Sequence, residues 1–144
     1  MFADRPTSKV EIARALYSPA YVSLEWALHE HGLIPDVVFA VTLVSPRGKR
    51  RFVTPAGEFI YHKIKQKLFC GFDPDSLLAT PEKALVDYFY LFSGRLTPEP
   101  TFWDQMRWQN LERLDFKKVK AFSILTGVDK VLELAGSLER YAKA

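Results

Sequence analysis

The feature that most constrains this fold is a helix start in the middle of the chain, with the sequence TPEKALVD. Thr80 can accept a hydrogen bond from an unpaired backbone N–H, so we expect it to be the N-cap. Pro81 suits the first helical turn, and Glu82 lies at the positive end of the helix dipole. Lys83 and Asp87 are four residues apart and can pair along one face of the helix.

Two shorter helices are predicted before this one. Ser8 and Glu11 have the spacing of a capping box, which predicts a helix over residues 9–17. A second helix is expected to begin near Ser23 and to end at Gly32, because glycine readily takes the left-handed conformation that closes a helix.

Between the helices, the pattern changes to one typical of strands. Residues 37–44 are rich in β-branched side chains and apolar on both faces, which predicts a strand covered on both sides. Turn residues then separate further short apolar runs. The predicted strands cover residues 37–44, 50–54, 58–64, 68–72 and 77–79. Because the first three are joined by tight turns, we expect an antiparallel meander.

From Pro81 onward the chain is predicted to be helical to its end. The predicted helices cover residues 81–93, 101–108, 115–126 and 128–141. The fold class is therefore α+β, with a small antiparallel sheet of three to five strands packed by helices and a helical C-terminal third. We expect a connector with a short helix at 1–18, an α+β core domain at 19–96 and a helical subdomain at 97–144 packed on the core.

Aromatic residues make up 14% of the chain, and most are expected in the core. We assign Tyr21, Trp26 and Phe39 to the core together with the aromatics of the Pro81 helix. Trp103 and Trp108 are predicted to be the more exposed pair, with packing of their short helix against the core as the alternative.

Composition limits the class of protein. The chain has 144 residues, 48% apolar and 26% charged, which fits one packed domain rather than a disordered chain. Its single cysteine, Cys70, excludes an internal disulfide and fits a reducing cytoplasm. It has no apolar run long enough to span a bilayer and no signal peptide pattern. We therefore expect a cytoplasmic protein with no membrane partner.

No pattern indicates catalysis or a cofactor. His29 and His31 are two residues apart, so on a helix they point in different directions and cannot chelate one metal. His62 and Cys70 add no recognisable metal-ligand spacing. Glu58 and Lys63 lack the second strand carboxylate that a metal-dependent nuclease would need. The expectation is a protein that is not an enzyme and that holds neither metal nor cofactor.

Basic residues form local groups although the net charge is only +3. The candidates for nucleic-acid binding are Arg47, Lys49, Arg50, Arg51, Lys63, Lys65 and Lys67. The first four lie on a predicted turn and strand start, and the three lysines alternate, so they share one face if the strand continues. Two interpretations remain open: a solubilising surface, or contacts to the phosphate backbone of DNA.

A second block upstream, YVSLEWAL running into HGLIP, pairs with the TPEKALVD block. In this order, with a β-rich segment between them, the two blocks resemble the AbiEi family of antitoxins from bacterial abortive-infection systems. The resemblance covers residues 18–92, about half of the chain. Its signature residues are Tyr21, Ser23, Glu25, Gly32, Pro35, Thr80, Pro81, Glu82, Lys83 and Asp87. We interpret them as fold signatures: caps, turns and a buried polar pair.

The resemblance implies a function. Members of this family join an N-terminal winged helix-turn-helix to a larger domain needed for antitoxicity, and the matched blocks look like the larger domain. The family counteracts a nucleotidyltransferase-like toxin without a stable complex, an arrangement called type IV. Fewer than 20 residues precede Ser18, too few for the winged helix; a natural short form, a truncated gene and a fragment all fit.

We therefore expect an antitoxin or transcriptional-regulator-like domain in phage defence. The alternative is a non-enzymatic nucleic-acid-binding module that uses a basic β-hairpin.

Overall fold

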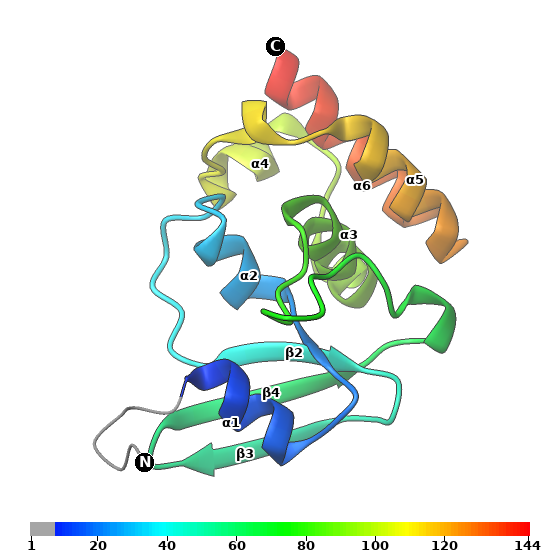
Figure 1. The fold of residues 1–144 in the computed structure, drawn as a ribbon. Helices are drawn as coiled ribbons and strands as arrows, with labels where there is room; N and C mark the ends of the chain where they lie inside the picture. Colours follow the sequence, from blue (N-terminus) through cyan, green and yellow to red (C-terminus); the bar gives the residue numbers. More distant parts are fainter. Residues whose placement is uncertain (1–7) are drawn as a thin grey trace.

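The computed structural model describes residues 8–144 and has an α+β architecture. A four-stranded sheet has α1 on one face and α2 and α3 on the other, and α4, α5 and α6 lie farther from the sheet (Figure 1). The helices are α1 (Lys9–Leu16), α2 (Leu24–Glu30), α3 (Pro81–Phe92), α4 (Pro100–Met106), α5 (Phe116–Thr126) and α6 (Asp129–Lys143). The strands are β1 (Tyr21–Val22), β2 (Val41–Ser45), β3 (Arg50–Thr54) and β4 (Gly57–Lys63).

The α+β class and the helical C-terminal third agree with the prediction, whereas the antiparallel meander is wrong. The strand order is β1-β2-β4-β3, and β2 runs parallel to β4, with Val41 beside Phe59 and Ser45 beside Lys63. Of the strands in residues 8–144, β1 pairs with β2 and β3 with β4 in the antiparallel sense. The chain between β2 and β4 therefore crosses over by way of the edge strand β3.

Side-chain character explains why β4 rather than β3 lies beside β2. Phe59 and Tyr61 of β4 are fully buried, which suits an interior strand. By contrast, β3 begins with the exposed residues Arg50 and Arg51, and charge on an edge strand discourages pairing with another chain. The turn after β2 fits both arrangements, so its residues do not distinguish a hairpin from a crossover.

The helix α1 covers the sheet face formed by Phe59 and Tyr61. The hydroxyl of Tyr61 donates a hydrogen bond to the Ala13 carbonyl at 2.7 Å, and Ser8 caps the helix through the backbone N–H of Glu11. Ala13 belongs to the same buried core as the sheet. The described part of the predicted connector at 1–18 is thus packed on the core, and its first seven residues lie outside the described range.

The strand predicted over 37–44 is shorter than expected. It starts at Val41, and the preceding Val37 and Phe39 are 70% and 86% exposed. The assignment of Phe39 to the core is therefore wrong. Because β4 begins at Gly57 and Phe59 pairs with Val41, residues 37–38 run past the end of their neighbouring strand.

The strand predicted at 68–72 is also wrong. A 3-10 turn occupies Gln66–Leu68, and the pairing that remains consists of isolated bridges from Phe72 to Ala79 and from Leu78 to Val22. The carbonyl of Leu68 points instead to the ammonium of Lys83. A side-chain contact thus takes the place of a strand pairing.

The C-terminal helices lie close to their predicted bounds. Asp115 caps α5 through the N–H of Lys117, and Gly127 ends it with a positive φ of 71°. Trp103 of α4 is fully buried beside Phe89 of α3 and donates to the Ser137 hydroxyl of α6 at 2.9 Å. The prediction that Trp103 and Trp108 are exposed is therefore wrong. The alternative, that the short helix packs against the core, is confirmed.

Candidate functional site

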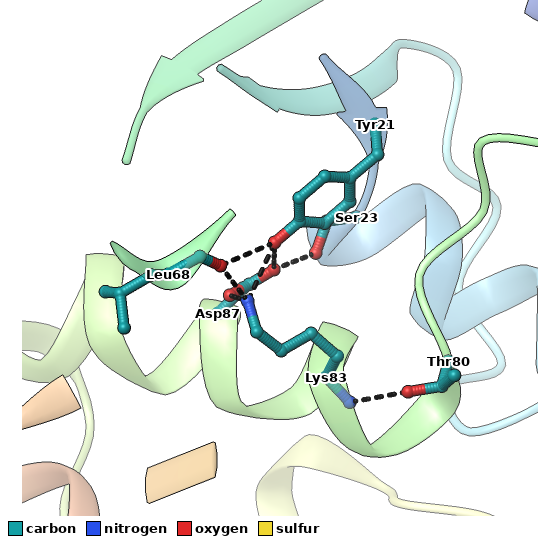
Figure 2. Close-up of polar contacts among 6 residues, drawn as sticks. All are labelled: Tyr21, Ser23, Leu68, Thr80, Lys83 and Asp87. Carbon is teal, nitrogen blue, oxygen red and sulfur yellow. Dashed lines mark hydrogen bonds and ion pairs between the residues drawn. The ribbon is translucent and has the colours of Figure 1, made fainter. Parts of the chain in front are cut away.

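Four signature residues from the two blocks meet in one buried network, shown in Figure 2. Tyr21 and Ser23 come from β1 and the start of α2, whereas Lys83 and Asp87 lie one turn apart on α3. One carboxylate oxygen of Asp87 accepts hydrogen bonds from the Tyr21 hydroxyl at 2.7 Å and the Ser23 hydroxyl at 2.8 Å. The network thus ties the first block of the sequence to the second.

The ammonium of Lys83 completes this network. It donates to the other carboxylate oxygen of Asp87 at 2.6 Å, to the Tyr21 hydroxyl at 2.8 Å and to the Leu68 carbonyl at 2.7 Å. An ammonium has three N–H donors, so all of them are used. The predicted pairing of Lys83 with Asp87 is confirmed, and the pair is buried as interpreted, with side-chain exposures of 1% and 2%.

Burial dominates the electrostatics of the network. It raises the pKa of Asp87, and the Lys83 ammonium and the hydrogen bonds from Lys83, Tyr21 and Ser23 oppose this rise. Burial also raises the pKa of Tyr21 far above its ordinary value, and the neighbouring Asp87 raises it further. Tyr21 therefore stays protonated and remains a donor to the carboxylate.

This arrangement is suited to holding segments together. The hydroxyl of Tyr21 both donates and accepts, and its ring stacks on Phe72 at 4.5 Å with an interplanar angle of 10°. Lys83 and Asp87 are each at least 98% buried by the exposures above. A substrate would have to break these bonds to reach either group, so the geometry favours the interpretation of the network as a fold signature.

The remaining signature residues of the second block are also structural. Thr80 accepts from the N–H of Lys83 at 3.2 Å, and Pro81 occupies the first turn, which confirms the predicted cap. Glu82 is nearly buried, and its carboxylate accepts from the N–H of Asp115 at 3.0 Å. It therefore links the start of α3 to the start of α5.

The end of the first block packs against the C-terminal region. Gly32 has a positive φ of 73°, as expected at the end of α2, and its carbonyl accepts from the Asn110 side chain at 2.7 Å. Pro35 follows in the loop that leads to β2. Both residues thus shape the path of the chain after α2.

Sequence reasoning missed Gly71, which packs against the network. Its φ is +78°, and a Cβ at this position would lie 2.7 Å from Cγ of Lys83. The absence of a side chain at Gly71 therefore leaves room for the stem of Lys83. The turn sequence around it could have indicated a glycine with positive φ, but only the fold reveals which side chain fills the space.

Glu25, unlike its near neighbour Ser23, lies outside the network. Leu24, just before it, has a positive φ of 62°, so the chain turns sharply after Ser23. Ser23 faces Asp87, whereas Glu25 lines a cavity together with Thr42, Ile60 and other residues. Its Oε1 atom is covered and has no hydrogen-bond partner among residues 8–144.

The predicted basic residues gather at one end of the sheet. The register places Lys63 beside Ser45, where β2 ends and the chain turns toward β3. All three arginines of the group have partners within the chain: Arg47 and Arg50 lie over the Tyr17 ring at 4.4 and 5.3 Å, and Arg51 forms an ion pair with Glu58. These arginines are therefore partly engaged in the fold.

The four lysines of this group are exposed and form no ion pair within the described range. They are Lys49, Lys63, Lys65 and Lys67. The condition under which Lys63, Lys65 and Lys67 would share a strand face is not met, because β4 ends at Lys63 and a 3-10 turn begins at Gln66. The turn at 45–48 is a crossover turn rather than a hairpin turn, because β2 and β3 are not neighbours. Arg50, Arg51 and Lys63 lie instead on the antiparallel hairpin of β3 and β4.

Residues 8–144 contain no group of three His, Cys, Asp or Glu side chains arranged to hold a metal ion. In the same range, every helix is too short or too polar to cross a bilayer. Comparison of the chain with models of protein families, with curated proteins and with solved structures gave no match.

Proposed function

We propose that this chain is an AbiEi-like antitoxin domain, cytoplasmic, that counteracts a nucleotidyltransferase-type toxin without forming a stable complex with it. The observation that supports this proposal is the convergence of the two resembling blocks. Tyr21 and Ser23 of the first block and Lys83 and Asp87 of the second bond to one another in a single buried network. The residues that carry the resemblance therefore act together, as a fold signature would require.

Growth rescue tests the proposal. A toxin of the nucleotidyltransferase class encoded next to this chain is expressed from an inducible promoter, with and without the chain on a second plasmid. The expected result is restored growth only when both are expressed. Unchanged killing, with the chain confirmed as folded and abundant in the same cells, would contradict the proposal.

A second arm tests whether the network is architectural. Because Lys83 and Asp87 are buried and fully bonded, rescue by a Lys83→Met variant should fall only as far as its folded amount falls. Rescue is plotted against the amount of folded protein for the parent and for several variants of the network. A variant that is abundant and folded but inactive would instead reveal a reactive site at this position.

A second candidate function is binding of nucleic acid at the basic end of the sheet. The exposed lysines Lys49, Lys63, Lys65 and Lys67 favour it, since they form no ion pair with acidic side chains of residues 8–144. Contacts of lysine with phosphates give salt-dependent affinity and little sequence preference. No toxin is required in this case.

A matched pair of triple variants separates this candidate from a solubilising surface. Lys63, Lys65 and Lys67 are replaced by alanine in one variant, and Lys117, Lys118 and Lys120, exposed on α5, in the other. If the first group binds duplex DNA, only its variant should bind more weakly. The slope of log affinity against log salt should then fall by about 0.9 for each phosphate that the variant no longer neutralises. Equally weakened binding in the two variants would indicate a general charge effect.

A further inference from the structure

A cavity of about 510 Å³ lies between α2, the loop of residues 34–40 and the end of α4. Ile60 of β4 and Tyr88 of α3 complete its walls. Small-molecule sites in proteins occupy about 300–1,000 Å³ and are mostly apolar with a few polar groups that orient the ligand. The size and lining of this cavity fit that class of site.

Among the polar side chains that line this cavity, Glu25 supplies a carboxylate without an ion-pair partner in residues 8–144. Its Oε1 atom is covered, yet it accepts no hydrogen bond from the described part of the chain. Arg107 lines the same cavity, but its guanidinium donates to Asp36 at 2.7 Å. Glu25 is only partly buried and its carboxylate forms no ion pair within residues 8–144, so a cationic ligand can supply its counter-charge.

The lip of the cavity adds an aromatic ring. Phe39 lines the opening and is 86% exposed, with Val37 beside it in the same loop. An aromatic face attracts an organic cation, and a carboxylate bonds to it directly. A metal ion would need several oxygen or nitrogen ligands, and residues 8–144 gather no such group of three.

We propose that this cavity binds a small organic cation, a primary ammonium or a guanidinium on a short apolar chain, with Glu25 as its counter-ion. The charged head donates to the carboxylate of Glu25 through its accessible oxygen, Oε2. The apolar chain packs on Ile60 and Ile34, and Phe39 lies over the entrance. This binding site is independent of the proposed antitoxin function.

Calorimetric titration of the full chain tests the proposal with matched probes. Pentylamine and agmatine supply the two head groups, and 1-pentanol is the neutral counterpart of pentylamine. We expect saturable binding of at least one of the two cations and none of the alcohol at the same concentration. Binding of the alcohol as tight as that of pentylamine, or no binding of either cation, would overturn the proposal.

A capped arginine, N-acetyl-arginine-N-methylamide, distinguishes the source of the cation. Tighter binding of agmatine and pentylamine than of the capped residue indicates a free small molecule. Tighter binding of the capped residue indicates an arginine side chain of another polypeptide. Both results support the same cation chemistry in the cavity.

Two variants locate the binding. Glu25→Gln keeps the shape of the side chain and removes its charge, and we expect at least a tenfold loss of affinity for the cation, about the effect of one charge-assisted hydrogen bond. Glu30→Gln changes an exposed carboxylate of the same helix and should leave the affinity unchanged. Phe39→Ala alters only the exposed lip and should weaken binding without affecting the fold. Parent-like affinity in Glu25→Gln would overturn the proposal, because Glu25 is the proposed counter-ion.

Discussion

Asp87 and Glu25 both belong to the resembling blocks, and the fold treats their carboxylates in opposite ways. Asp87 is almost fully buried and accepts from Lys83, Tyr21 and Ser23. Glu25 has a covered oxygen with no donor in the described residues. The chain thus satisfies one carboxylate completely and leaves the other for a partner that it does not itself supply.

The difference indicates which carboxylate can contribute to recognition. A satisfied buried network fixes a conformation, and any external group would have to displace bonds already made. A partly buried carboxylate that makes no ion pair within the described residues can gain one when a cation arrives and loses none to the protein. Substitution at Asp87 should therefore lower the stability of the protein strongly, whereas substitution at Glu25 should change it little.

The largest effect is expected when the buried pair is broken. In Lys83→Met, Asp87 loses its counter-ion, and its pKa, already raised by burial, should rise further. Removal of one partner of a buried ion pair typically costs about 3–5 kcal/mol. Urea denaturation should therefore give a free energy of unfolding lower by about that amount.

A double variant is the control for this prediction. Lys83→Met with Asp87→Leu removes both charges and should be less destabilised than the sum of the two single variants, because no unpaired charge stays buried. Tyr21, Ser23 and the Leu68 carbonyl still lose partners, so stability should not return fully to that of the parent. Strict additivity would contradict the coupling described above.

A smaller loss of stability is expected when Gly71 is substituted. In Gly71→Ala, a residue with a Cβ must adopt a φ of +78°, and the Cβ would press on the stem of Lys83. The left-handed conformation alone costs roughly 1–2 kcal/mol, and the close approach to Lys83 adds to it. Gly94→Ala is the matched control, since its φ is not in the left-handed range and nothing lies within 4 Å of its Cβ. Equal melting temperatures for the two variants would exclude this role of Gly71.

The N-cap at Thr80 should contribute less to stability than Gly71 does. Thr80→Ala removes the acceptor for the N–H of Lys83 and should lower stability by about 1 kcal/mol. Thr80→Ser keeps the hydroxyl and should stay close to the parent in the same thermal melts. A similar loss in both variants would indicate that packing of the threonine methyl group matters more than the cap.

These residues also show which features the sequence could predict. The cap at Thr80 and the pairing of Lys83 with Asp87 are local, since helix geometry alone brings residues four apart together. The convergence of Tyr21 on Asp87 joins residues 66 positions apart, so no local rule reaches it. The lysines of the basic group were identified, but their common strand face depended on β4 continuing beyond Lys63, and it does not.

The parallel pairing of β2 with β4 was missed for a related reason. Turn residues such as those at 45–48 specify a reversal of the chain, but they do not specify which strand becomes the neighbour. The cavity beside Glu25 was also beyond prediction, because it depends on the path of the loop at 34–40. Phe39 is exposed, contrary to its assignment to the core, since β-propensity does not indicate that the strand begins only at Val41.

The smallest expected effect on stability is at Glu25. Glu25→Gln breaks no hydrogen bond in the described part of the chain, so the free energy of unfolding should change by no more than about 0.5 kcal/mol. Under the same conditions, substitutions at Asp87 should cost several times more. A loss at Glu25 as large as at Asp87 would contradict the comparison between the two carboxylates.

His62 provides a more sensitive probe of the charge on Glu25. Burial lowers the pKa of His62, the carboxylate of Glu25 raises it, and Lys49 and Arg95 lower it. In Glu25→Gln the opposing charge is gone, so the pKa of His62 should fall further. Titration of the His62 ring signals by NMR measures this shift, and Glu30→Gln, at an exposed carboxylate of the same helix, should leave those signals unchanged.

The lowered pKa of His62 determines how the stability of the protein changes with pH. Below a pH of about 6.5, the ordinary pKa of histidine, the unfolded chain takes up a proton at His62 that the folded protein takes up only at lower pH. Stability should therefore fall as the pH drops through the interval between the two pKa values, and the fall should be larger in Glu25→Gln because that interval is wider. His62→Gln should remove this part of the dependence. Melting temperatures measured from pH 7.5 to pH 5 in the three proteins test it, and a steeper loss in the parent than in Glu25→Gln would show that Glu25 does not act on His62 as a charge.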